Sequence, residues 1–224
     1  MNNFEKNDFE KGLLKYFTIN QLNKIQSQII GIAGAGGLGS NCAFNLVRSG
    51  FNKFYIYDFD KVDYSNLNRQ FYFLEQVGLP KVEALAVNLK KINPDIAVFA
   101  QEIEINEDNI LGLFEKCSIV VEAFDKAESK KMLAESFYDS QKLIVSASGL
   151  AGYGDADGVI TRKIRDDFYL IGDMKSEAGG DLSPYSPGVN VAAAKQADVI
   201  LKFVLDDKNL LTLKCFYNRV GLCW

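Results

Sequence analysis

The sequence contains no histidine among its 224 residues. This absence excludes Ser-His-Asp and Cys-His catalysis, a histidine-ligated metal and an imidazole pH switch. Any chemistry must therefore use carboxylates, lysines, arginines, backbone amides or a bound metal.

Cysteine is scarce and unpaired in sequence: the four residues form no Cys-x-x-Cys motif. A disulfide framework or a Cys-rich zinc site is not expected, so we predict no zinc. The N-terminus lacks the basic and then apolar pattern of a secretory signal. No apolar run approaches the ~18 residues that a membrane span requires. These features predict a cytoplasmic protein with free thiols and no membrane partner.

The charge balance is mildly acidic, with 25 basic and 29 acidic side chains, and it gives no electrostatic reason to expect nucleic acid as a partner. The length and the 48% apolar content suit one domain that buries about 70% of its unfolded surface. We expect a single domain over residues 1–224. It would comprise an N-terminal helical segment (1–26), a nucleotide-binding core (27–148) and a C-terminal part with strands, a loop and a helix (149–224).

Short apolar runs alternate with stretches of helical periodicity, which is typical of βαβ units. The pattern predicts an α/β fold, a Rossmann-like doubly wound sheet that is mainly parallel. Strands are expected at 27–33, 53–57, 96–103, 119–123 and 143–148, and helices at 39–49, 80–92, 107–115 and 127–140.

The C-terminal part has a different texture. Two short β-like runs, 159–164 and 168–171, predict an antiparallel extension of the sheet. Glycine, proline and serine in 175–187 predict a long mobile loop. The apolar stretch 189–205 predicts a buried helix, and 210–219 a closing strand.

A glycine-rich turn separates the first expected strand from the first core helix. It contains Gly34, Gly36, Gly37 and Gly39, and Asp58 ends the next strand. Glycines permit close backbone approach, and a helix N-terminus offers unpaired N–H groups to phosphate, while the acid suits ribose hydroxyls. The turn therefore predicts nucleotide binding; the alternative is a Gly-rich turn between packed elements.

Three charged residues have positions that structure alone does not require. Lys81 lies in the first turn of its helix, where a cation opposes the macrodipole. Arg69 follows an Asn-rich loop and offers a planar fork of donors to phosphate. Asp125 falls just past the end of a core strand and suits magnesium. Each alone reads as a solvated surface charge, but together with the glycine turn they share one rim of the sheet. That combination suits nucleotidyl transfer, in which charge on phosphate is neutralised, and hydride transfer would not need it.

The motifs that carry this site are G-A-G-G-L-G, D-F-D, S-N-L-N-R-Q, G-L-P-K-V-E and E-A-F-D, between Gly34 and Asp125. With them, the chain resembles the ThiF, MoeB and ubiquitin-activating-enzyme family, which adenylates the C-terminal Gly-Gly carboxylate of ubiquitin-like proteins. The runs A-S-G-L-A-G-Y-G (147–154) and S-E-A-G (176–179) are similar to the short bacterial ThiF branch. That branch acts on the sulfur carrier ThiS in thiamine thiazole biosynthesis.

The resemblance implies an ATP- and magnesium-dependent adenylyltransferase, a ThiS-like carrier as partner and a homodimer. It also implies roles for individual residues. Binding of the nucleotide would fall to Gly34, Gly36, Gly37, Gly39, Asp58, Asp60, Asn66, Arg69 and Lys81. Catalysis would rest on Arg69, Lys81 and Asp125, with Asp125 binding magnesium.

The sequence departs from the family pattern in three places. Relatives that form a covalent carrier intermediate place a cysteine before the last long helix, but residues 149–214 contain none. Cys215 and Cys223 are the remaining candidates, because Cys42 reads as a small buried hydrophobe. Many relatives also supply an arginine from an N-terminal helix, whereas residues 1–26 contain lysines but no arginine. Asp125 is followed by Lys126 rather than the common asparagine.

Two other functions remain open at this point. An NAD- or FAD-dependent oxidoreductase would use the same glycine turn and Asp58, but would leave the charged residues unexplained. A non-catalytic module that binds ATP or a carrier would account for the missing N-terminal arginine.

Overall fold

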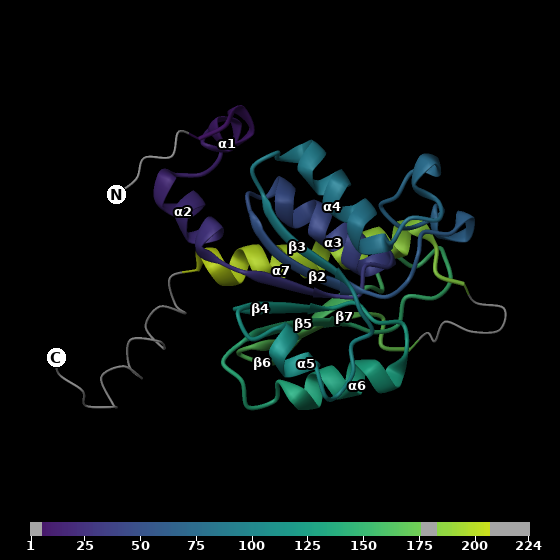
Figure 1. Ribbon diagram of the computed structural model, residues 1–224. Coiled ribbons are helices and arrows are strands. Elements are labelled where there is room, and N and C mark those ends of the chain that lie inside the picture. The colour runs from purple at the N-terminus through teal and green to yellow at the C-terminus, as the bar shows by residue number, and fades with distance from the viewer. Residues whose placement is uncertain (1–5, 176–182, 207–224) are drawn as a thin grey trace.

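A computed structural model describes residues 6–175 and 183–206 of the chain. Its centre is a seven-stranded sheet with the strand order β3-β2-β1-β4-β5-β7-β6 (Figure 1). The strands are β1 (Ile30–Ala33), β2 (Lys53–Asp58), β3 (Ala97–Glu102), β4 (Ile119–Glu122), β5 (Leu143–Ala147), β6 (Ile160–Arg165) and β7 (Phe168–Gly172). The α-helices are α1 (Asp8–Leu13), α2 (Ile19–Ser27), α3 (Gly37–Arg48), α4 (Lys81–Ile92), α5 (Ile110–Leu113), α6 (Ala127–Ser136) and α7 (Ser186–Leu205).

The direction of winding reverses beside β1. This strand pairs in parallel with β2 on one side and with β4 on the other. In an open α/β sheet, the crevice for ligands lies at the carboxyl ends of the strands at such a switch point. The loops that follow β1, β2 and β4 therefore meet at one rim.

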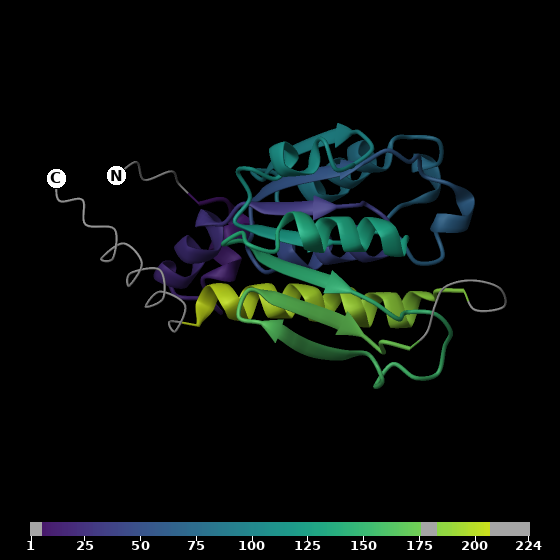
Figure 2. The same ribbon diagram turned by 90° about the horizontal axis from the view of Figure 1, so that it is seen from below.

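The C-terminal strands extend the sheet as the sequence predicts. β7 pairs in parallel with β5, and β6, which precedes β7 in the chain, pairs antiparallel with β7 and forms the edge of the sheet (Figure 2). The Rossmann-like fold with an antiparallel C-terminal extension is confirmed.

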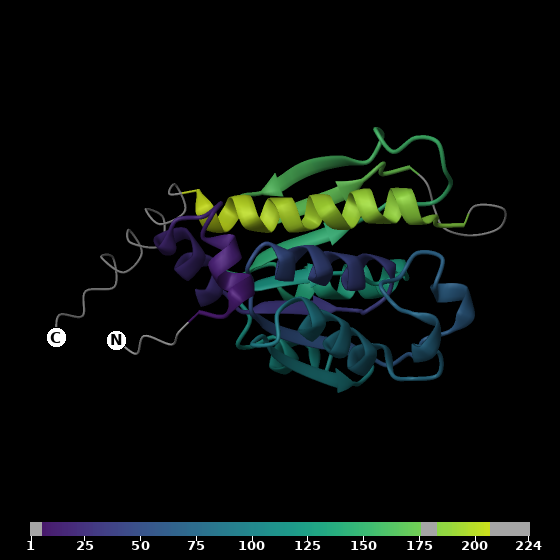
Figure 3. The same cartoon turned by 90° about the horizontal axis from the view of Figure 1, so that it is seen from above.

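Helices cover both faces of the sheet. α3, α4 and α7 lie on one face and α5 and α6 on the other (Figures 1 and 3). Each face has its own apolar core: the first centres on Leu46, Leu85 and Ile200, and the second on Phe114 and Leu133, all fully buried. Packing on both faces explains why β1 and β4 read as continuous apolar runs.

Several element boundaries differ from the sequence expectations. α7 begins at Ser186, three residues earlier than expected, because Pro187 fits the first helical turn. The helix expected over 127–140 ends at Ser136, and the strand expected from residue 27 begins at Ile30, since Ser27 closes α2. The closing strand expected at 210–219 lies outside the described residues.

The N-terminal helices lie far from the glycine turn of their own chain. Leu22 and Ile25 of α2 are fully buried, and they approach Gly50 at the carboxyl end of α3. The glycine turn is at the opposite end of α3 (Figure 3). None of the helices in the described part of the chain combines the length and apolar character that crossing a bilayer demands.

Candidate nucleotide-binding site

The turn after β1 depends on two glycines. Gly34 has a φ of +98°, and a Cβ there would lie 2.9 Å from the carbonyl oxygen of Ala123. A Cβ on Gly39 would lie 1.8 Å from the carbonyl oxygen of Gly34, so no larger residue fits. Gly36 is the N-cap of α3 and makes no side-chain cap, which leaves the first turn of this helix open to an anion.

Asp58 is fixed directly to this turn. It ends β2, and its Oδ2 accepts a hydrogen bond from the amide of Ala35 at 2.6 Å, while its Oδ1 accepts one from the amide of Asp60 at 2.7 Å. Burial raises the pKa of Asp58, although these two amides and Lys81 oppose the rise. Each carboxylate oxygen keeps a lone pair, which suits ribose hydroxyls.

Lys81 has its anionic partner within the protein. The side chain is buried at the start of α4, and its Nζ donates to Oδ2 of Asp60 at 2.7 Å. This ion pair explains how a cation is tolerated at the positive end of a helix. An ammonium group has three donors, so the contact with Asp60 leaves capacity for phosphate oxygens.

Arg69 lies beside the start of α3. Its Nη1 donates to the carbonyl of Ser65 at 3.1 Å and to Oδ1 of Asn68 at 2.8 Å. A Cβ on Gly37 would lie 3.6 Å from Cγ of Arg69. Asn41 fixes this arrangement, because its Nδ2 donates to the carbonyls of both Gly37 and Arg69.

Asn66 shapes the loop before Arg69 in a different way. It ends a short 3-10 helix, Tyr64–Asn66, and its Oδ1 accepts from the amide of Asp63 at 3.1 Å. Asp63 in turn accepts from the amide and hydroxyl of Ser65. The side-chain oxygen of Asn66 thus helps to close the loop, and its amide nitrogen is the group suited to phosphate.

Asp125 stands on the other side of the turn. It is exposed between β4 and α6, two residues beyond the Ala123 carbonyl that packs against Gly34. Within residues 6–175 and 183–206, no three carboxylate, cysteine or histidine side chains gather as metal ligands. An exposed carboxylate of this kind is one oxygen ligand, and magnesium in nucleotide sites is usually held by one or two carboxylates together with phosphate oxygens.

Two further residues at the turn were missed by the sequence reasoning. Gln70 belongs to a motif with no assigned role; it is 8% exposed, its Oε1 has no partner, and its Nε2 lies 3.9 Å from a Cβ built on Gly36. Tyr72 donates its buried hydroxyl to the carbonyls of Ala35 at 2.6 Å and Lys81 at 3.2 Å. No spacing pattern marks Tyr72. The side-chain amide of Gln70 thus lies beside the glycine turn, with its nitrogen toward Gly36 and its buried oxygen without a partner.

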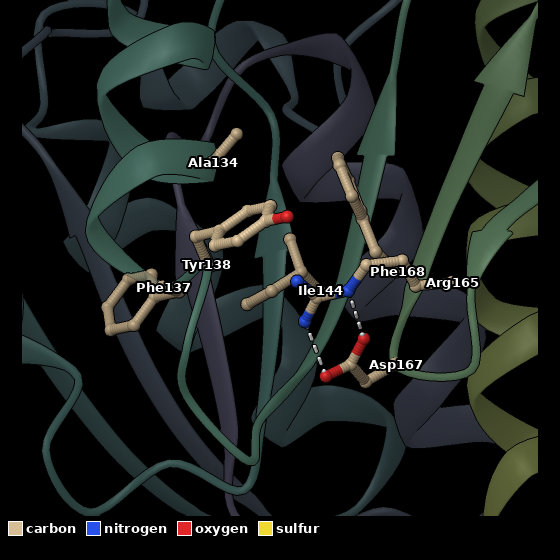
Figure 4. Close-up of a pocket in the computed structure, with 7 residues that line it drawn as sticks. All are labelled: Ala134, Phe137, Tyr138, Ile144, Arg165, Asp167 and Phe168. Carbon is tan, nitrogen blue, oxygen red and sulfur yellow. Dashed lines mark hydrogen bonds and ion pairs between the residues drawn. The ribbon is translucent and has the colours of Figure 1, made fainter.

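A separate small pocket lies at the opposite rim, at the amino ends of β5 and β7 (Figure 4). Arg165 lies over the ring of Tyr138 there and makes two hydrogen bonds to Asp167, at 2.9 and 2.8 Å. Ligands of open α/β sheets bind at the carboxyl ends of the strands, so a pocket at their amino ends is not the expected place for the nucleotide.

The sequence pattern of the ThiF family matches residues 11–220. The chain belongs to the ThiF family. The resemblance drawn from its motifs is therefore confirmed.

Two relatives of this ThiF-family chain show how far the likeness extends. The adenylyltransferase and sulfurtransferase MOCS3 of Aedes aegypti is 34% identical over 128 residues, which are 57% of this chain and 29% of that protein. The ubiquitin-like modifier-activating enzyme 5 of Bombyx mori is 28% identical over 206 residues, 92% of this chain and 47% of that protein. The chain thus spans less than half the length of these two relatives.

Solved structures share the fold of this ThiF-family chain. The Escherichia coli tRNA N6-threonylcarbamoyladenosine dehydratase TcdA, solved with ATP, superposes with a TM-score of 0.79 at 20% identity, covering 87% of this chain and 93% of TcdA. E. coli MccB, solved with ATP, superposes with a TM-score of 0.68 at 20% identity, covering 89% of this chain and 64% of MccB.

Substitution of Gly39 tests the glycine turn. In Gly39→Ala the added methyl group meets the Gly34 carbonyl, so we expect a loss of about 1–3 kcal/mol in unfolding free energy and about tenfold weaker ATP binding. Denaturant unfolding and calorimetric titration measure both. Gly12→Ala is the control, because that helical glycine has open space around it and the change should stabilise slightly. A Gly39→Ala protein with parental stability and ATP affinity would contradict this account of the turn.

Proposed function

We propose that this ThiF-family protein is an ATP- and magnesium-dependent adenylyltransferase of the cytoplasm. Its substrate would be the C-terminal Gly-Gly carboxylate of a ThiS-like sulfur-carrier protein, in thiamine thiazole biosynthesis. The observation that carries the proposal is the convergence on one glycine turn. Asp58 accepts a hydrogen bond from the amide of Ala35, and Arg69 lies against Gly37. The turn that bears Asp125 packs on Gly34. The names of the relatives and the ATP held by the structural neighbours support the same reaction.

The proposed reaction needs positioning and charge neutralisation rather than acid-base chemistry. An oxygen of the carrier carboxylate attacks the α-phosphorus of ATP, the bond to the bridging oxygen breaks, and the electron pair leaves with pyrophosphate. The carboxylate is already ionised, so no proton has to be removed. Arg69 and Lys81 would neutralise developing charge, and the open first turn of α3 would orient the phosphates. Magnesium held by Asp125 would add positive charge at the phosphates.

The proposal is confined to the adenylation step. Cys42 and Cys117 are buried free thiols, and burial raises the pKa of Cys117 to about 12 and that of Cys42 further. Neither is therefore a nucleophile at neutral pH. Cys42 is the buried apolar residue that the sequence predicts, whereas Cys215 and Cys223 lie outside the described residues.

ATP–pyrophosphate exchange tests the activity directly. We expect exchange that requires magnesium and a ThiS-type carrier ending in Gly-Gly, and none with a carrier lacking the final glycine. ATP binding without exchange for any carrier would favour a non-catalytic module. Binding of NADH or FAD without ATP binding would favour an oxidoreductase. Exchange with a ubiquitin-like carrier other than ThiS would retain adenylation and reject the assignment to thiamine biosynthesis.

Single substitutions test the assigned residues in the same assay. Lys81→Ala and Asp125→Ala should each lower the exchange rate by about 10²-fold or more, the usual effect of losing one transition-state electrostatic group. Lys126→Ala is the matched control, because this neighbouring side chain is exposed. Its rate should stay within about fivefold of the parent, since an exposed charge contributes about 1 kcal/mol or less. Near-parental rates in both test variants would show that the site is elsewhere.

We propose a homodimer formed through the segment between β2 and α4. This segment, which precedes Lys81, carries large apolar residues whose surface is 44–69% exposed to solvent: Phe59, Tyr64, Phe73, Leu74 and Leu79. Several exposed apolar side chains on one segment are typical of a protein–protein interface. A dimer formed here would place the partner subunit close to the nucleotide site.

Substitution of Leu74 tests this interface. Leu74 is 67% exposed, so Leu74→Asp should fold normally yet oppose burial of the segment, and light scattering after size exclusion should report the mass of a monomer. Leu111→Asp is the control, because Leu111 is 58% exposed on α5, away from this segment, and the variant should remain a dimer. A dimeric Leu74→Asp protein, or a monomeric parent, would contradict the proposal.

A further inference from the structure

A buried charged cluster lies at the carboxyl ends of β4 and β5. Glu122, the last residue of β4, has no exposed surface. Nζ of Lys130 in α6 donates to both of its carboxylate oxygens, at 2.9 and 3.2 Å, and the hydroxyl of Ser146 in β5 donates to Oε2. The amide of Phe124 donates to Oε1 at 2.7 Å. The side-chain oxygens of Glu122 thus accept four hydrogen bonds.

Stability alone does not account for this cluster. Desolvation of two charges offsets most of their attraction, and apolar residues of similar size are often as stabilising as a buried ion pair. The cluster instead fixes the positions of its neighbours, because the four hydrogen bonds accepted by Glu122 have defined directions. The relevant question is which backbone these bonds hold in place.

The cluster holds the turn that bears Asp125. The bond from the Phe124 amide fixes the backbone between Ala123, whose carbonyl packs against Gly34, and Asp125. The side chain of Glu122 is fully buried and its oxygens are occupied by these hydrogen bonds, so its link to Asp125 runs through this backbone.

The same cluster ties this turn to the neighbouring strand and helix. Lys130 also donates to the carbonyl of Ala147 at the end of β5, at 2.9 Å. From α7, Nε2 of Gln196 donates to the carbonyl of Glu122 at 3.1 Å and to that of Val145 at 3.3 Å. Contacts from β5, α6 and α7 thus resist movement of the turn that bears Asp125.

We propose that Glu122, held by Lys130 and Ser146, is a positioning residue that sets the distance between Asp125 and the glycine turn, and so the binding of magnesium with ATP. The inference rests on the proposed function, because Asp125 binds magnesium there. Groups that orient a metal ligand in this way typically change metal affinity or activity 10- to 100-fold when they are lost.

The test compares Glu122→Gln with the double variant Glu122→Gln/Lys130→Met. Glu122→Gln removes the charge with little change of shape and leaves Lys130 without its counter-ion, so it should also lower the melting temperature. The double variant removes both charges, which should restore much of the melting temperature. In both, we expect the half-saturating magnesium concentration for exchange to rise about tenfold and kcat to fall about tenfold or more. Binding of ATP measured without magnesium should stay within about twofold of the parent.

A purely structural role makes a different prediction. In that case activity and magnesium dependence would recover with the melting temperature in the double variant, and this result would overturn the inference. Parental magnesium dependence in a folded Glu122→Gln protein would overturn it as well. The control is Asp167→Asn, which breaks the ion pair to Arg165 at the opposite rim and should leave the magnesium dependence unchanged.

The inference and the proposed function can fail separately. Absence of exchange in the parent with every carrier would reject the adenylyltransferase. Calorimetry of ATP binding with and without magnesium would then still decide the role of Glu122. If magnesium increases the affinity for ATP less in both Glu122 variants than in the parent, the role of Glu122 is supported. An equal increase in ATP affinity in the parent and the variants, or no increase in the parent, would reject the role of Glu122.

Discussion

The contact between the backbones of Gly34 and Gly39 is the constraint on which the site depends. The two backbones lie too close for a Cβ between them, and this close approach lets the chain pass from β1 to α3 within three residues. The first turn of α3 has no side-chain cap and stays open. The surrounding parts attach to this turn by short contacts. Asp58 accepts from the Ala35 amide, and Tyr72 donates to the Ala35 carbonyl. A displacement of the turn would therefore disturb the acid at the end of β2 and the start of α4 together.

The two cations assigned to phosphate and the carboxylate assigned to magnesium come from different parts of the chain. Arg69 comes from the segment between β2 and α4, Lys81 is the first residue of α4, and Asp125 comes from the turn after β4. Because β1 separates β2 from β4 in the sheet, the glycine turn lies between the cations and the carboxylate. A polyphosphate on the open end of α3 would thus have cations on one side and a magnesium ligand on the other.

The sequence predicts the parts of this site that depend on local pattern. Periodicity gives the order of strands and helices, and the glycine spacing gives the turn, although α3 begins at Gly37 rather than at the expected Gly39. Local pattern cannot give pairings between distant residues. Tyr72 reaches a carbonyl 37 positions away, and Ser146 reaches Glu122 across 24. Such contacts depend on which strands become neighbours, and that is decided by tertiary packing.

The same distinction explains Lys81. From sequence, a cation at a helix start indicates an anionic partner nearby, and in the structure Asp60 already occupies that place. The two interpretations are compatible, because the Lys81 side chain is buried while that of Asp60 is half-exposed. A buried ammonium that kept only water as its partner would be costly, so Asp60 holds it ready in the absence of phosphate. Fixed charges of this kind need no proton transfer, which is how a chain without histidine can still form a site for phosphate chemistry.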